Sequence, residues 1–327
     1  MVEACRLSPA AQKILQLKGG WRLMKTTTKH LDIPLEERLA GLRGCQIPSL
    51  NDPATFADRL FLLEERLGTC HALLVGLLVA CGHAQPEELC AGFTLFEQAL
   101  SNVKAALDME TYTKLHPWTI SGYVTKRVGF DSANSTGVNL DSRPANSTWV
   151  MLHQLAEQQS LTPIPHIISD CTTQAPLVAL FTLGLGLPTA EARVYPSVHP
   201  LAVFDFPKQA YMFHWNGLYP DTRYFPPKTT EPGFAHPLSF VATHLAWQTN
   251  RCVVRHQGAL SSEEIALVRL KLACAEGLNP FNEIIPETYR WLARLAGDVE
   301  LENLEDARLK ALEELGYNGF TCAVLPG

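Results

Sequence analysis

The sequence predicts an α+β protein in which helical regions flank a short antiparallel sheet. Residues 1–115 carry apolar side chains at helical spacing and almost no strand-like alternation. Residues 201–215 contain two short strand-like stretches separated by Pro207-Lys208, which is typical of a hairpin. Residues 237–318 return to helical spacing. We therefore expect three units: a helical region over 1–115, a central core over 116–232 and a helical region over 233–327.

Local signals predict where several helices begin. Asp52-Pro53 and Pro86 are both typical of a helix start, because proline fits the first turn. Residues 131–147 are rich in Ser, Asn, Asp and Gly and predict a loop, and a helix is expected after it, from Thr148 to Gln159. The most apolar run, His71–Cys81, is shorter than the roughly 20 residues that span a bilayer, so it predicts a buried helix.

Composition excludes several classes of function. The net charge is −6 and no basic run occurs, which argues against binding nucleic acid through its phosphates. No stretch predicts a membrane segment, and the first residues lack the apolar core of a signal peptide. The nine cysteines are odd in number and loosely spaced, which favours free thiols in a reducing compartment and a cytoplasmic protein. No phosphate-binding glycine motif is present, so we expect no nucleotide cofactor.

A cysteine immediately before an apolar helix is the main indication of chemistry. Cys171 follows Asp170 and precedes the apolar run 177–183, which ends at Gly184. The amino terminus of a helix carries partial positive charge, which favours thiolate and can stabilise an oxyanion. His199 opens a strand further along the chain, at a sheet rim, where it can accept the thiol proton and return it to a leaving group.

The expected hairpin supplies a third residue. If Phe206 and Gln209 flank the two-residue turn, the register places Asn216 opposite His199, within reach to orient the imidazole. A slip of one residue would present the other face of the strand. Asp221 is the alternative third member, and Asn216 also fits a plain turn before a glycine.

Residues 166–225 resemble the transglutaminase-like (papain-like) superfamily of cysteine enzymes. The resemblance rests on Asp170-Cys171-Thr172, on the apolar helix and on the exit Leu185-Gly186-Leu187-Pro188 followed by Ala192-Arg193-Val194. It implies a nucleophile helix packed on an antiparallel sheet, with Cys171, His199 and Asn216 as the catalytic triad. The sequence departs from the family pattern at Ser169, where glycine is usual, and at Asn216, where the family has aspartate.

The resemblance implies a cysteine-dependent amide or isopeptide hydrolase, or an acyl transferase, acting on a protein or peptide substrate. An acyl-enzyme intercepted by water gives hydrolysis, and one intercepted by an amine gives transamidation. The sequence does not separate the two outcomes. The alternative is a catalytically inactive core that serves as a protein-interaction scaffold, which the asparagine at the third position favours.

Other polar residues admit weaker interpretations. The upstream oxyanion donor could be Trp149, Gln158 or Gln159, all of which precede the nucleophile. The candidate zinc ligands are His71, Cys81, His83 and Cys90. Their spacing matches no known four-ligand zinc site, so a zinc site is not expected. Three further histidines are interpreted as surface or packing residues: His236, His244 and His256. Residues 260–318 loosely resemble tetratricopeptide-type helical repeats.

Overall fold

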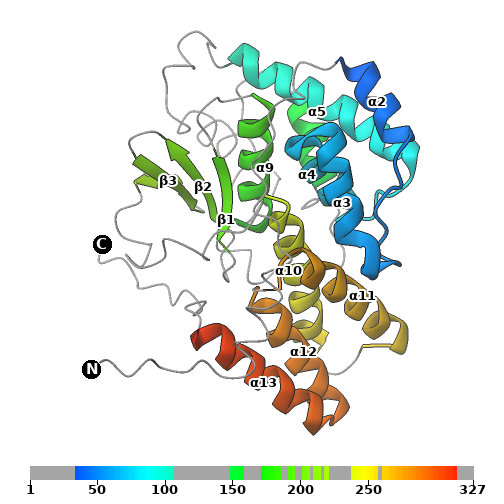
Figure 1. Ribbon diagram of the computed structural model, residues 1–327, viewed down its shortest axis with the longest axis vertical. Helices are drawn as coiled ribbons and strands as arrows, with labels where there is room; N and C mark the ends of the chain where they lie inside the picture. Colours follow the sequence, from blue (N-terminus) through cyan, green and yellow to red (C-terminus); the bar gives the residue numbers. More distant parts are fainter. Residues whose placement is uncertain are drawn as a thin grey trace.

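A computed structural model of the chain shows a helical assembly with α4 near its middle (Figure 1). It describes residues 34–106, 148–157, 171–185, 237–256, 260–280 and 282–314, together with the backbone of four short strands between residues 191 and 220. The helices are α2 (Leu35–Arg43), α3 (Pro53–Leu67), α4 (Thr69–Ala80), α5 (Pro86–Ala106), α8 (Thr148–Glu157), α9 (Cys171–Gly184), α10 (Ser239–His256), α11 (Ser262–Leu278), α12 (Ile284–Ala296) and α13 (Val299–Glu314).

Helix α4 is the centre of the core. Every one of its residues is buried, which follows from a sequence that is apolar on all sides of the helix. It contacts α3, α5, α8, α9 and α10. At Gly76 the absence of a side chain lets α4 approach α10, where a Cβ would lie 2.6 Å from Val241 Cγ2. The buried helix predicted over 71–81 is therefore confirmed.

The predicted helix starts are also confirmed. Helix α3 begins at Pro53, after Asp52, and α5 begins at Pro86. Helix α8 begins at Thr148, as expected from the end of the polar segment before it. These boundaries depend on local chemistry. The backbone N–H groups in the first turn of a helix have no acceptor within the helix, so proline, which has no N–H, fits there at no cost.

The carboxyl-terminal helices extend the same core. Helix α10 packs on α4, α9 and α11. Helix α12 packs between α10 and α13 (Figure 1). One hydrophobic cluster of buried residues runs from Leu42 to Leu292. The division into three units over 1–115, 116–232 and 233–327 stays a prediction.

Four short strands form an antiparallel meander beside α9 (Figure 1). They are β1 (Glu191–Tyr195), β2 (Leu201–Phe206), β3 (Gln209–His214) and β4 (Gly217–Pro220), in the order β1-β2-β3-β4. In the β2–β3 ladder Phe206 pairs with Gln209 and Ala202 pairs with Phe213. The backbone pairing of this hairpin is therefore the one expected from a two-residue turn at Pro207-Lys208.

The α+β fold class predicted from the sequence is wrong. The part of the chain whose side-chain packing the structure describes contains ten helices and no strand, so the fold class of this part is all-helical. The alternating stretches after residue 191 form short strands, as their local pattern predicts. A fold class depends on what builds the core, and each buried apolar residue of the described core comes from a helix or a segment joining helices.

No helix in the described ranges combines the length and the apolar character needed to cross a membrane.

Candidate functional site

The backbone places Cys171 at the amino terminus of a buried helix. Cys171 is the first residue of α9. Helix α9 packs against α4 and α10, and its residues from Leu177 to Phe181 are fully buried. Pro176 lies inside the helix, in the second turn, where it cannot donate the usual backbone hydrogen bond. The thiol of Cys171 lies outside the described side chains.

The other members of the predicted triad lie outside the described residues. His199 precedes β2, Asn216 falls between the end of β3 at His214 and the start of β4 at Gly217, and Asp221 follows β4. The ladder between β2 and β3 has the predicted register, and His214 pairs with Gly217 in the next ladder. The assignment of Cys171, His199 and Asn216 as a triad therefore stays a prediction.

Of the three candidate oxyanion donors, the structure describes Trp149. Its indole stacks on the His83 imidazole, with ring centroids 4.5 Å apart and an interplanar angle of 25°. Trp149 is the second residue of α8, and it is partly buried against the core. Gln158 and Gln159 lie outside the described residues.

A cysteine and a histidine far apart in the sequence meet where α4 ends. Cys81 Sγ lies 3.5 Å from His244 Nε2 on α10, and Gln248 Nε2 lies 2.7 Å from the same ring nitrogen. Burial raises the pKa of the Cys81 thiol, against the opposing effects of a backbone hydrogen bond from Thr148 and the charge of Lys271. The thiol is therefore neutral near pH 7 and donates to His244.

The Cys81–His244 cluster extends to Lys271 on α11, which is partly buried. Burial lowers the pKa of the Lys271 ammonium, while attraction to Cys81 and Cys252 opposes the change. The sequence interpretation of His244 as a packing residue missed the contact. A signal was present, because His244, Gln248 and Cys252 recur every four residues and so share one face of α10. Their partner on α4 could not be found from spacing alone.

His71, one of the residues weighed as a zinc ligand, has other partners. His71 Nδ1 lies 3.1 Å from Leu67 O and its Nε2 lies 2.5 Å from Arg38 Nη1. Among the described residues no group of three or more His, Cys, Asp or Glu side chains is placed to hold a metal ion. His71 belongs instead to a buried network with Arg38 and Glu97, whose carboxylate oxygen lies 2.5 Å from Arg38 Nη1.

Burial and the neighbouring charged groups have opposite effects on the pKa of Glu97. Burial would raise the pKa of the Glu97 carboxyl, but the nearby His71 ring, whose Nε2 lies 3.9 Å from Glu97 Oε1, and the hydrogen bond and charge of Arg38 outweigh it and lower that pKa to about 2. Glu97 is thus ionised at neutral pH and pairs with Arg38. The network joins α2, α4 and α5.

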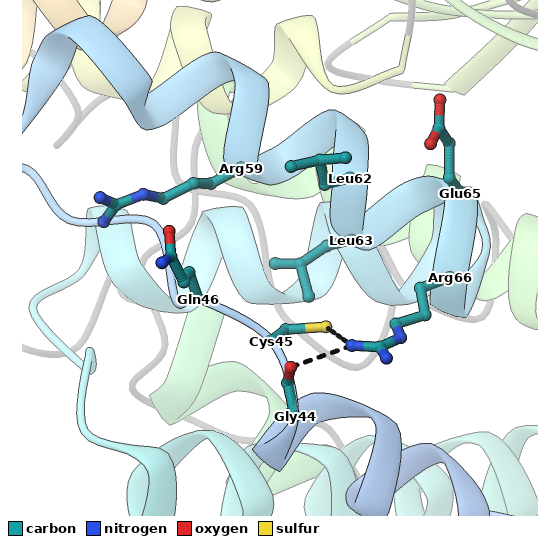
Figure 2. Close-up of a pocket in the computed structure, with 8 residues that line it drawn as sticks. All are labelled: Gly44, Cys45, Gln46, Arg59, Leu62, Leu63, Glu65 and Arg66. Carbon is teal, nitrogen blue, oxygen red and sulfur yellow. Dashed lines mark hydrogen bonds between the residues drawn. The ribbon is translucent and has the colours of Figure 1, made fainter.

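A pocket of about 420 Å³ opens between α3 and the segment that follows α2 (Figure 2). Arg66 on α3 reaches across it and donates from Nη1 to Cys45 Sγ at 3.2 Å and to Gly44 O at 3.0 Å. Leu62, which is 62% exposed, and Leu63 form an apolar wall. No sequence signal pointed to this pocket, because its two sides come from elements that meet only in the folded chain.

No protein-family model, no curated protein and no solved structure matches this chain.

Proposed function

We propose that this chain is a cysteine-dependent amide or isopeptide hydrolase, or an acyl transferase, with Cys171 as its nucleophile. The observation that carries the proposal is the position of Cys171 as the first residue of α9. The free N–H groups and partial positive charge at a helix start favour a thiolate and can stabilise the oxyanion formed during acyl transfer. The resemblance of residues 166–225 to transglutaminase-like enzymes supports the same role.

In the proposed reaction the Cys171 thiolate attacks the carbonyl carbon of an amide. His199 takes the thiol proton and delivers it to the departing amine, leaving a thioester on the enzyme. Water then attacks the thioester in hydrolysis, or a second amine attacks it in transamidation. Asn216 accepts the imidazole N–H and fixes the tautomer.

The substrate class is a protein or peptide, and we place the reaction in the cytoplasm. The mechanism requires a reduced thiol. None of the six cysteines whose side chains the structure describes forms a disulfide: Cys45, Cys70, Cys81, Cys90, Cys252 and Cys274. Reduced thiols in this number favour a reducing compartment.

A second cysteine competes for the same role, and one experiment separates them. Cys81 touches His244, but burial raises the pKa of its thiol, so we expect it to react slowly. The full-length protein is treated with a limiting amount of iodoacetamide at pH 7, and the modified cysteine is mapped by peptide mass spectrometry. We expect Cys171 to react first, and His199→Ala to slow its reaction roughly tenfold.

The matched variants are Cys171→Ser and Cys81→Ser, assayed on a pool of peptide amides. Cys171→Ser should abolish turnover and Cys81→Ser should leave it unchanged. Loss of turnover in Cys81→Ser alone would assign the chemistry to the Cys81–His244 cluster. Uniform labelling of several cysteines, unaffected by His199→Ala and without turnover, is the result expected of an inactive interaction scaffold.

A further inference from the structure

Helix α13 lies at the end of the described bundle, where it packs on α12 (Figure 1). Two ion pairs add to this packing: Arg290 with Asp306 at 3.0 Å and Arg294 with Glu302 at 2.6 Å. A further bridge reaches past α12, because Arg308 Nη2 on α13 lies 2.7 Å from Glu276 Oε1 on α11. Helix α13 is therefore attached by its packing on α12 and by charged bridges to two helices.

Glu305 is an acid of α13 that is buried without a full set of partners. The residue is 5% exposed, and its buried Oε2 accepts no hydrogen bond in the described part of the chain. Arg308, almost one turn later on the same helix, has its Nη1 3.7 Å from this oxygen, which is too long for a hydrogen bond. Taking a carboxylate out of water without hydrogen bonds is costly, so the site favours the neutral acid.

The charged and titratable groups around Glu305 come from three helices. Glu276 on α11 and Arg308 on α13 contribute opposite charges. Burial raises the pKa of the Glu305 carboxyl to about 7, although the charge of Arg308 opposes the change. On α12, burial and the charge of Glu276 raise the pKa of the Tyr289 phenol to about 12, against the charges of Arg308 and Arg269. Tyr289 therefore stays neutral near pH 7, where Glu305 changes its charge.

We propose that Glu305 and Glu276 compete for Arg308, so that loss of the Glu305 proton draws Arg308 away from α11 and loosens α13. While Glu305 is neutral, Arg308 Nη2 bridges to Glu276 and donates to Pro280 O at 3.4 Å. Once Glu305 is ionised, its buried oxygen requires a hydrogen bond, and Arg308 Nη1 supplies it by closing the 3.7 Å gap. The guanidinium is a rigid plane, so this movement weakens both contacts of Nη2.

The direction of the pH effect follows from the burial of Glu305. Because its pKa in the docked helix lies above the ordinary value of 4.5, its contribution to docking is full below that pH and is lost as the pH rises through about 7. Loosening of α13 exposes Ala311 and Leu312, which are buried in the docked helix. The attachment of α13 thus responds to pH near neutrality, whether or not Cys171 has the proposed activity.

Hydrogen exchange of the full-length protein tests the loosening. Backbone protection, taken relative to the intrinsic exchange rate at each pH, is measured by mass spectrometry for peptides of α11 and α13 at pH 5.5 and pH 8. We expect protection of α13 to fall roughly tenfold over this range, after allowance for solvent screening, and that of α11 to fall much less. Glu305→Gln should remove the fall. Glu302→Gln, which removes the α13 carboxylate that pairs with Arg294, should keep it.

A second substitution, Glu276→Gln, tests the competition for Arg308. At pH 5.5 it removes the bridge to α11 and should lower the protection of α13 roughly threefold, as expected for a partly exposed ion pair. At pH 8 it should have little effect, because Arg308 has moved to Glu305. In the Glu305→Gln background the effect should be equal at both pH values. Three results would each overturn the proposal: no fall in α13, an equal fall in α11 and α13, or an equal effect of Glu276→Gln alone at both pH values.

Discussion

Arg38 donates a hydrogen bond to His71 Nε2 at 2.5 Å, within a site where the arginine is 6% exposed and the histidine 1%. Because arginine has no acceptor, this nitrogen of His71 is unprotonated, and Nδ1 donates to Leu67 O at 3.1 Å. The ring also stacks on Phe93, with centroids 5.2 Å apart. The short helix α2 is therefore anchored to α4 and α5 by a buried charge.

Replacing Arg38 with Met should destabilise the fold. The change leaves the Glu97 carboxylate and His71 Nε2 without their cationic partner, and breaking a buried pair costs about 3–5 kcal/mol. Urea unfolding measures the free energy. Arg43→Met on the same helix removes an exposed arginine and should stay within about 0.5 kcal/mol of the parent. Adding Glu97→Gln to Arg38→Met should recover part of the loss, and equal effects of Arg38→Met and Arg43→Met would show that the network does not anchor α2.

Glu305 should make stability fall as the pH rises. Burial raises the pKa of this carboxyl to about 7, although Arg308 opposes the change. Arg308 lies 3.7 Å from Glu305 and closer, at 2.7 Å, to Glu276. Because the folded pKa lies above the unfolded one, the contribution is full below about pH 4.5 and is lost as the pH approaches 7.

The test is Glu305→Gln, which keeps the shape and removes the titration. We expect the variant to be more stable than the parent at pH 8 by about 1–2 kcal/mol, after allowance for solvent screening, and nearly unchanged at pH 4. Thermal unfolding across this range measures it. Glu300→Gln, at an exposed position of the same helix α13, should show no such dependence. A parent whose stability rises between pH 4 and pH 8 through this residue would contradict the assignment.

Two glycines in helices should respond to alanine in opposite directions. In Gly76→Ala the new Cβ would lie 2.6 Å from Val241 Cγ2 and 3.3 Å from a Leu60 methyl, so the packed helices must shift at a cost of about 1–3 kcal/mol. In Gly277→Ala the nearest atom is Ala57 Cβ at 3.5 Å, and higher helix propensity should stabilise by up to about 1 kcal/mol.

Chemical denaturation of both glycine variants gives the comparison. Adding Val241→Ala to Gly76→Ala should make the two changes non-additive, because the second removes the atom with which the first collides. Additive effects would mean that α4 and α10 are not in direct contact at Gly76.

The orienting residue of the proposed triad can be tested by turnover. Asn216→Ala should lower the rate by roughly tenfold to a hundredfold without altering unfolding, because an unfixed imidazole still accepts protons but with poorer geometry. Asn216→Asp should be tolerated, since a carboxylate holds an imidazolium at least as well. Asp221→Ala should have little effect. If Asp221→Ala abolishes turnover and Asn216→Ala is neutral, Asp221 is the third member.

The sequence by itself determined those features that depend on a few neighbouring residues. Prolines at positions 53 and 86 fix helix starts, and the run after His71 is apolar on all sides and becomes the buried helix α4. The turn at Pro207-Lys208 fixes the pairing of β2 with β3. Each depends on dihedral preference or periodicity, which act over one or two turns of chain.

Only the tertiary structure decided the fold class and the contacts between distant residues. Arg38 meets His71 and Glu97, and Cys81 meets His244, because helices far apart in sequence pack around α4. Helix periodicity shows which face of a helix is buried and not which other helix covers it. Which helices pack against each other depends on how the side chains of all the helices fit together. Positions such as Gly76 determine how closely two helices can approach.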